Sequence, residues 1–208
     1  MPPRPHAPKA ANSRHGGAGV YPPAPHNKGM PVQIGRRESD FTHPLGLLSD
    51  CHRRIERFLN VLLTLSRTRA GSALDSAESA SLRTALDYFR DAAPEHTADE
   101  EESLFPRMRA AGALAELDQL ESDHAAAAAA HAEVDALGSR WLDAGSLPAE
   151  SATRLADLLL QLDETYRRHI ALEDSEIFPA AGRVLSREQL AEVGREMENR
   201  RIRARTER

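Results

Sequence analysis

Apolar residues recur at alternating steps of three and four positions along four long stretches of this 208-residue chain. Such spacing gathers apolar side chains on one face of an α-helix, and the period-two alternation that indicates strands is missing. The stretches span residues 45–62, 82–100, 117–141 and 155–173, and glycine or proline follows each of them. Four amphipathic helices of about 25 residues with short joins predict an all-α fold, an antiparallel up-down-up-down four-helix bundle.

Three local features modify this helix pattern. Ser186 is a favourable N-cap for a fifth helix that we expect to reach about residue 200. Pro94 lies inside the second stretch, and we expect it to kink that helix, because the apolar stripe keeps its phase across the proline. The alternative is that a new helix begins at Pro94. Leu-Phe-Pro at 104–106 and Ile-Phe-Pro at 177–179 are expected to pack and to stop their helices.

Composition divides the chain into three parts. Residues 1–40 hold eight of the thirteen prolines and five of the twelve glycines without a sustained period, which is typical of a disordered leader. Residues 41–185 form the predicted bundle, and residues 186–208 form a C-terminal helix with a basic tail.

The charge and hydropathy limit the expected partners. The formal net charge of −5 combines +4 in residues 1–40 and +3 in residues 195–208 with −12 in residues 41–194. The strong negative charge of residues 41–194 argues against nucleic-acid binding. No apolar run reaches the roughly 18 residues of a membrane span, and the first residues lack the apolar segment of a signal peptide. We therefore expect a cytoplasmic protein with no membrane partner, while a protein partner for the basic tails and the oligomeric state stay open.

Each apolar stripe contains one histidine near its middle. These are His52, His96, His124 and His169. A lone histidine on such a face is usually a satisfied core residue, but burying four imidazoles in a small core is costly unless each has a partner. A shared metal ion is the most economical partner, because imidazole is a common metal ligand.

Two glutamates strengthen the prediction of a metal site. His96 precedes Glu100, and His169 precedes Glu173, by four residues, so each imidazole and carboxylate share one helix face, one turn apart. The sequence also repeats: residues 96–106 (HTADEEESLFP) align without gaps to residues 169–179 (HIALEDSEIFP). Two helical hairpins would each supply two histidines and one glutamate. That inventory fits a dinuclear site with bridging carboxylates.

Over about residues 43–200 the sequence resembles hemerythrin-like proteins, the family with the HHE cation-binding domain. The motifs HPLGLLSDCHRRIE, HTADEEESLFP and HIALEDSEIFP carry the resemblance. It implies a four-helix bundle around a non-haem di-iron centre, two Fe ions with an oxo or hydroxo bridge. By position it implies four histidine ligands and two bridging carboxylates: His52, His96, His124, His169, Glu100 and Glu173.

One position departs from the oxygen-carrying members of the family, which have a second histidine four residues after the ligand on the third helix. Ala128 stands there in this chain. His131 follows His124 by seven residues, about 10.5 Å along the helix, and we interpret it as a residue beside the site or in the core. The missing ligand puts reversible oxygen carriage in doubt and leaves an open position for exogenous ligands.

Three functions fit this inventory. The first is binding or sensing of a small diatomic ligand such as O2 or NO, or of the iron or redox state. The second is an enzyme that reduces O2 or peroxide, and the third is a bundle in which the metal ions have only a structural role. Tyr166 is the one phenol expected near the site. Because a single candidate proton donor is thin support for catalysis, we expect a binding protein rather than an enzyme.

The remaining features of the motifs are expected to be structural. The acids that flank them are expected to be solvated, although one could orient a ligand imidazole; they are Glu101, Glu102, Asp174 and Glu176. The alanine run 125–130 is interpreted as helix propensity with close packing. Cys51, the single cysteine, excludes an internal disulfide and should point to a different face from His52.

Overall fold

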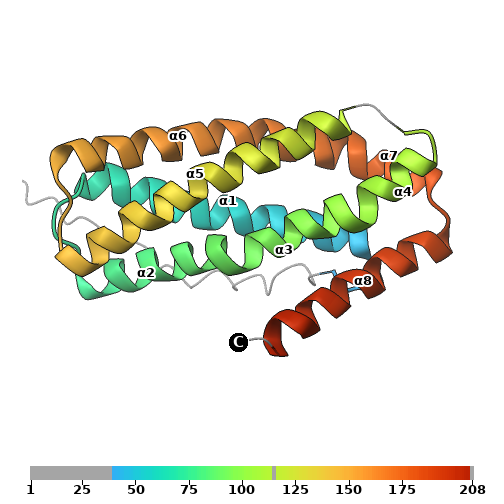
Figure 1. Ribbon diagram of the computed structural model, residues 1–208, viewed down its shortest axis with the longest axis horizontal. Coiled ribbons are helices and arrows are strands. Elements are labelled where there is room, and N and C mark those ends of the chain that lie inside the picture. The colour runs from blue at the N-terminus through green and yellow to red at the C-terminus, as the bar shows by residue number, and fades with distance from the viewer. Residues whose placement is uncertain (1–38, 114–115, 207–208) are drawn as a thin grey trace, which may run out of the picture. The chain divides into compact units, whose positions relative to one another are not determined.

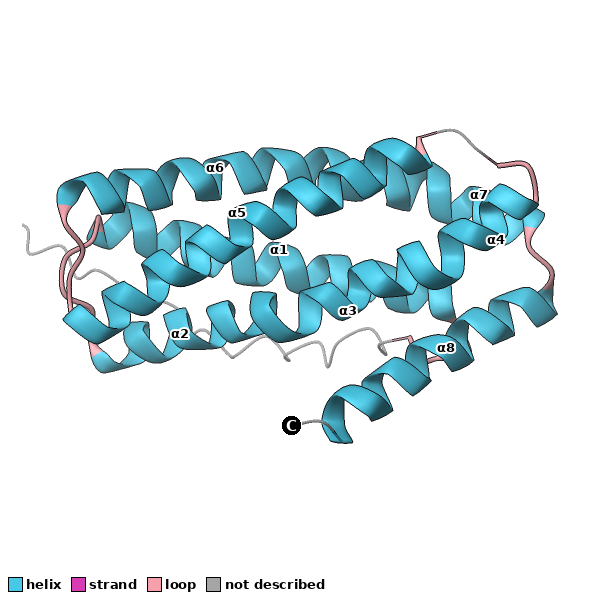
Figure 2. Ribbon diagram, in the orientation of Figure 1, coloured by secondary structure: helices cyan, strands magenta, loops and turns pink. Residues whose placement is uncertain are grey.

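The computed structural model describes residues 39–113 and 116–206, within which there are helices and loops and no strand (Figure 2). The chain divides into two compact units, Met1–Arg36 and Arg37–Arg208, and the described helices belong to the second. The all-helical prediction is therefore confirmed for the described residues. The predicted leader, residues 1–40, falls outside them except for Ser39 and Asp40.

The described chain contains four long helical stretches and a separate C-terminal helix (Figure 1). The first is α1, the second is assembled from five consecutive segments, the third is α5, and the fourth is assembled from three. Their bounds are α1 Pro44–Arg69; α2 Ser76–Asp87, η1 Tyr88–Ala92, α3 Ala93–Ala98, η2 Asp99–Leu104 and α4 Phe105–Ala110; α5 Leu117–Ala144; α6 Ala149–Leu172, η3 Glu173–Ile177 and α7 Phe178–Val184; and α8 Arg187–Thr206.

The long stretches pack in a ring. Helix α1 packs against α2 and α6, and α5 packs against the same two helices (Figure 1). Buried apolar side chains form two clusters, one around Leu59, Trp141 and Leu159 and the other around Phe105 and Met197. Every helix of this part of the chain is too short or too polar to span a bilayer. The cytoplasmic location stays a prediction.

Each long stretch passes from one apolar cluster to the other across a polar layer. On α1, for example, Leu48 belongs to one cluster and Ile55 to the other, and His52 lies between them. On α5, His124 likewise lies between Leu120 and Ala127. The histidines therefore occupy one level of the bundle, sealed by apolar packing on both sides.

Three π-helical segments, η1, η2 and η3, carry the chain past prolines. Their last turns close with N–H groups that bond five residues back, from Ala93 to Tyr88, from Phe105 to Glu100 and from Phe178 to Glu173. In each case proline is the second residue after the π segment. The wider turn accommodates a residue that lacks an N–H donor.

The three π segments test what was expected of the helix at Pro94, Pro106 and Pro179. Helical backbone continues past Pro94, with right-handed helical dihedral angles at Ala92 and Ala93 where η1 passes into α3, so the expected continuity is confirmed, while the kink stays a prediction. The prediction that Pro106 and Pro179 stop their helices is wrong, because α4 and α7 run on to Ala110 and Val184. The packing role of the neighbouring phenylalanines is confirmed, since both are buried.

Helix α8 follows Ser186, the predicted N-cap, and runs to Thr206, beyond the predicted end near residue 200. The Ser186 hydroxyl accepts the N–H of Gln189 at 3.2 Å, and the Gln189 side chain accepts the N–H of Ser186 at 2.9 Å, a reciprocal capping box. The helix packs against α1 and η2. A Cβ at Gly194 would collide with the carbonyl oxygen of Phe41, so only glycine permits this close approach.

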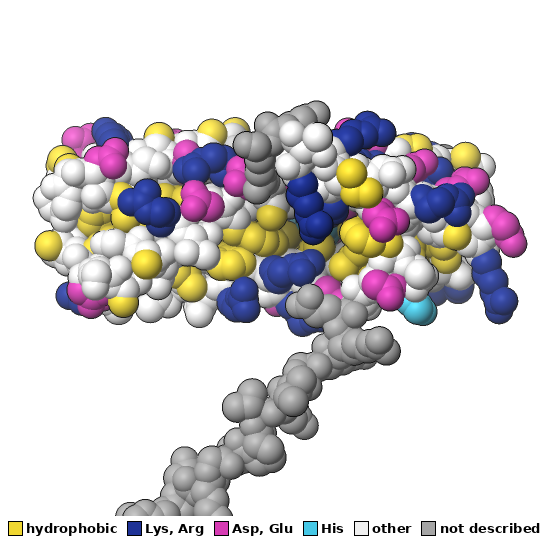
Figure 3. All heavy atoms as spheres, turned by 90° about the horizontal axis from the view of Figure 1, so that it is seen from below, with side chains coloured by type: hydrophobic (Ala, Val, Ile, Leu, Met, Phe, Trp, Pro, Cys, Tyr) yellow, Lys and Arg dark blue, Asp and Glu magenta, His cyan; other side chains and the backbone are white. Residues whose placement is uncertain are grey.

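Two arginines of α8 hold the π segment η2 in place. Arg200 and Arg201 lie 2.6 and 2.5 Å from the carboxylate oxygens of Asp99, which is fully buried and adjacent to Glu100. Arg201 also lies 2.7 Å from Glu95. In Figure 3, which views the molecule from below Figure 1, basic and acidic side chains are interspersed on the visible face.

Candidate metal centre

Six buried polar side chains converge in the polar layer. Helices α1, α3, α5 and α6 position one histidine each, and η2 and η3 position one glutamate each. Both glutamates are 0% exposed, and the histidines are at most 8% exposed. The structure thus brings together every residue that the sequence predicted for the site: His52, His96, His124, His169, Glu100 and Glu173. Their role as metal ligands stays a prediction.

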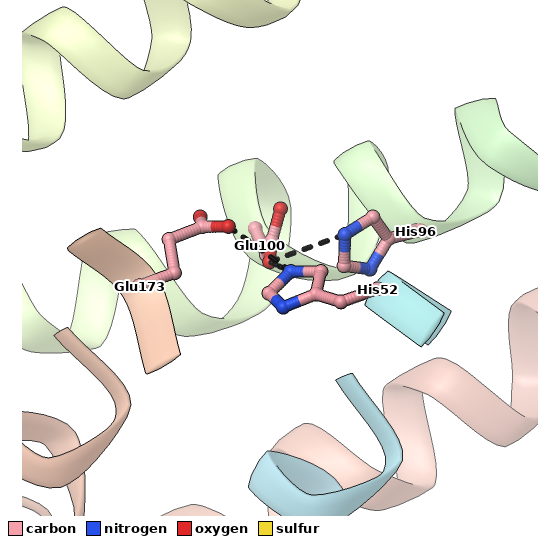
Figure 4. A group of neighbouring side chains, drawn as sticks. All are labelled: His52, His96, Glu100 and Glu173. Carbon is pink, nitrogen blue, oxygen red and sulfur yellow. Dashed lines mark ion pairs between the residues drawn. The ribbon is translucent and has the colours of Figure 1, made fainter. Parts of the chain in front are cut away.

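The six residues form two overlapping groups of potential ligands. One group joins His52 and His96 to both glutamates, as Figure 4 shows, and the other joins His124 and His169 to the same two glutamates. Within each group, the four ligand atoms lie within 4.8 Å of one another. The groups share Glu100 and Glu173, so the carboxylates lie where a pair of ions would be bridged.

Glu100 faces the two groups with different oxygens. Its Oε1 lies 3.5 Å from His96 Nε2, and its Oε2 lies 3.3 Å from His124 Nε2. Glu173 uses a single oxygen, because its Oε2 lies 3.1 Å from the Nε2 atoms of both His52 and His169. Glu100 Oε1 also lies 4.0 Å from His52 Nε2, so each carboxylate contacts at least one imidazole of each group.

The polar atoms of this layer lack the partners that buried groups normally have. Both oxygens of Glu100, both oxygens of Glu173 and Nε2 of His52 are buried without a hydrogen-bond partner. The Nε2 atoms of His124 and His169 face each other at 3.0 Å. Cations between these atoms would satisfy all of them, and a mixed imidazole and carboxylate set suits iron or another transition metal better than calcium or magnesium. The residues therefore fit a pair of transition-metal ions.

The pKa shifts of the charged groups in this layer also favour a bound cation. Burial, followed by the charge of Glu173, raises the pKa of Glu100 well above its ordinary value. Burial opposes ionisation of Glu173 too, but its contacts with His169 and His52 outweigh burial and lower its pKa. Burial also lowers the pKa of His96 far below its usual range, with the charge of His52 adding to the effect. Without a cation this cluster retains protons, and metal binding would release them.

Outer carboxylates hydrogen-bond to the far nitrogens of two histidines of the centre, and a third carboxylate lies near the far nitrogen of His169 without bonding to it. His52 Nδ1 lies 3.1 Å from Asp174 Oδ1, and His124 Nδ1 lies 2.9 Å from Glu101 Oε1. His169 Nδ1 lies 3.7 Å from Asp123 Oδ2. A proton on Nδ1 leaves the Nε2 lone pair free to face the centre.

The expectation that the flanking acids are solvated is confirmed for Glu102, Asp174 and Glu176, which are exposed, while Glu101 is half-buried. Two of the four acids also support the alternative that such an acid orients a ligand imidazole. Asp174 and Glu101 touch histidines of the centre, whereas Glu102 lies 3.2 Å from Arg200. Sequence reasoning assigned no role to Asp123. Its signal was its place directly before His124 in the sequence.

Residues beside the centre stay outside both groups. His131 Nε2 lies 3.0 Å from the Tyr166 hydroxyl, and Phe89 stacks on the His131 ring with centroids 4.1 Å apart. Burial lowers the pKa of His131 to about 4, so the ring is neutral at pH 7. Cys51 is also buried and lies outside both groups, and its sulfur accepts from Arg54 at 3.1 Å.

A void of about 10 Å³ adjoins the centre, close to the smallest volume that holds one water molecule. All four histidines of the centre and Tyr166 line it. The void among the four histidines thus has room for a group of about the size of one water molecule.

Comparison with known proteins agrees with this geometry. A 174-residue alignment with an uncharacterized protein of Haemophilus influenzae is 29% identical and covers 83% of this chain and 98% of that protein. The model of the hemerythrin HHE cation-binding domain matches residues 43–181, which include all six converging residues and end before α8. The chain belongs to the hemerythrin HHE cation-binding domain family.

Proposed function

We propose that this chain holds two iron ions in the polar layer and binds or senses a small diatomic ligand, O2 or NO, or the redox state of the iron itself. The observation that carries the proposal is that two groups of two buried histidines share both buried glutamates. A single ion would leave half of these nitrogens without a partner in an apolar core, at considerable cost.

The residues divide naturally between the two ions. His52 and His96 would hold one, His124 and His169 would hold the other, and Glu100 and Glu173 would touch both. Bound iron would supply a reversible change of oxidation state and a coordination position open to an exogenous ligand.

The chain's own residues would orient the ligands and exclude water. Asp174 and Glu101 keep the protons of His52 and His124 on Nδ1, away from the ions. The apolar clusters on either side of the layer exclude bulk water. Ala128, where oxygen carriers place a histidine, offers no ligand, so the α5 side of the centre has one imidazole fewer than theirs.

A second candidate function, an enzyme that reduces O2 or peroxide with the same centre, is favoured by one observation. The Tyr166 hydroxyl, hydrogen-bonded to His131, belongs to a residue that lines the void beside the four histidines. A phenol there could donate a proton to a ligand in the void.

Metal analysis with optical and azide-binding measurements tests the proposal. Protein purified from iron-replete cells should contain iron, absorb in the near ultraviolet and develop a new band with azide. Catalytic turnover of peroxide that Tyr166→Phe abolishes, while azide binding is retained, would promote the enzyme. Zinc in place of iron, with no optical band, would support a purely structural role and overturn the proposal.

A further inference from the structure

A second cavity, far larger than the void, lies next to the metal centre. A cavity of about 460 Å³ lies between α5 and the helix formed by α2, η1 and α3. Tyr166 and His124 line this cavity and also line the void, so the cavity adjoins the metal centre. Arg90 and Asp135, paired at 2.5 Å, line the cavity and link the two helices.

The alanine-rich part of α5 creates this space. Ala127, Ala128 and Ala132 line the cavity opposite Phe89 and Pro94. Larger side chains on α5 would fill the gap that these methyl groups leave. The interpretation of the alanine run 125–130 as close packing holds for Ala127 and Ala130, which are buried in an apolar cluster, whereas the exposed Ala128 lines the cavity.

The size of the cavity excludes a diatomic molecule as its matching occupant. A water molecule takes about 30 Å³ of liquid volume, so 460 Å³ corresponds to many waters. Cavities of about 300–1,000 Å³ are the usual sites of small organic ligands. The volume therefore suits a small organic molecule.

The cavity is mainly apolar and carries a buried polar group without a partner. Apart from the ion pair, most of its lining comes from alanine, leucine, valine, proline and phenylalanine side chains. His131 lines it as well, and its Nδ1 atom is buried with no hydrogen-bond partner. A buried polar atom without a partner needs an explanation, and an apolar pocket with a few polar groups is the ordinary form of a small-molecule site.

We propose that this cavity is a binding site for a small organic molecule with an apolar, ring-sized body and one hydroxyl-type group that hydrogen-bonds to the His131–Tyr166 pair. The proposal goes beyond the binding of a diatomic ligand and does not depend on which metal the centre holds. A molecule bound there would lie against Tyr166 and His124, beside the metal centre, as a substrate or an effector would.

Calorimetric titration of the full-length, metal-loaded chain with phenol and toluene tests the site. The two probes share a ring, and only phenol carries a hydroxyl. For molecules of this size we expect a phenol dissociation constant on the order of 1 mM. One hydrogen bond to a neutral group should make phenol bind about three- to tenfold more tightly than toluene.

Matched variants locate the binding. Ala128 and Ala129 are both exposed, but only Ala128 lines the cavity. Ala128→Phe should therefore weaken phenol binding at least about tenfold, whereas Ala129→Phe should leave it unchanged. His131→Phe keeps the stacking on Phe89 and should abolish the preference for phenol over toluene. Circular dichroism and metal content confirm that each variant is folded and loaded.

Several results would overturn the inference. They are the absence of binding of either probe at tens of millimolar, equal weakening by Ala128→Phe and Ala129→Phe, or an unchanged preference for phenol in His131→Phe. None of these readouts needs iron, so a failure here would leave the diatomic-ligand proposal standing. Zinc in the centre would defeat that proposal without affecting this one.

Discussion

Replacing Asp174 with asparagine tests how the outer carboxylates secure the histidines of the centre. Asp174 Oδ1 lies 3.1 Å from His52 Nδ1 and accepts the Ser49 hydroxyl at 2.7 Å. Loss of such an outer partner typically lowers metal affinity by about 10–100-fold. Because 40% of the Asp174 side chain is exposed and water screens its charge, we expect the lower end, about tenfold or 1.4 kcal/mol.

Glu101 and Asp123, the other two outer carboxylates, lie at different distances from their histidines and should affect the metal affinity to different extents. Glu101 lies 2.9 Å from His124 Nδ1, so Glu101→Gln should also lower the affinity about tenfold. Asp123 Oδ2 lies 3.7 Å from His169 Nδ1, beyond hydrogen-bond reach, so Asp123→Asn should lower the metal affinity by less than about threefold.

Competition against a chromophoric chelator at fixed pH measures these affinities. Glu102→Gln is the matched control, because Glu102 contacts Arg200 rather than a histidine. Equal losses in Asp174→Asn and Glu102→Gln, or a larger loss in Asp123→Asn than in Glu101→Gln, would refute the reasoning from hydrogen-bond geometry.

Three further predictions concern stability and the N-terminal residues. Burial disfavours the charged form of His52, but contacts with Asp174 and Glu173 raise its pKa to about 10. The metal-free chain should therefore lose stability as the pH rises from 6.5 to 10. The metal-loaded chain should instead lose stability as the pH falls, because protons compete with the metal for its ligands. Melting temperatures that change with pH in the same way with and without a chelator would contradict this prediction. Asp99→Ala leaves Arg200 and Arg201 of α8 without their buried partner and should lower the free energy of unfolding, measured by urea titration, by about 3 kcal/mol. A loss of less than about 1 kcal/mol would show that α8 does not fix η2. Deleting residues 1–36 removes none of the converging side chains, so helicity and metal content should not change, and loss of either would show that this segment supports the bundle.

The sequence predicted the helices and the six converging residues because both depend on local spacing. A step of three or four residues fixes which side chains share a helix face, and His-x-x-x-Glu places a nitrogen and a carboxylate one turn apart. Burial on an apolar stripe then implies a partner for each polar group. Those rules need no knowledge of how the helices pack, and they located His52 and Glu173 correctly in one layer.

What the sequence did not predict depends on contacts between helices or on backbone detail. Pro106 signals a helix stop in isolation, but the π turn at η2 lets the helix continue. Asp123 lies beside its own histidine in sequence yet faces His169 on the neighbouring helix. The cavity likewise requires Ala128 on α5 and Phe89 on η1 to face each other across a gap, which no single helix pattern encodes.

Metal stoichiometry of the natural chain and of its two glutamate variants tests the central claim most directly, which is that both carboxylates are shared by two ions. Elemental analysis should find two ions per natural chain and fewer than two in both Glu100→Ala and Glu173→Ala, with helicity retained. Two ions per chain in both variants would contradict the shared role of these glutamates and, with it, the assignment of the centre.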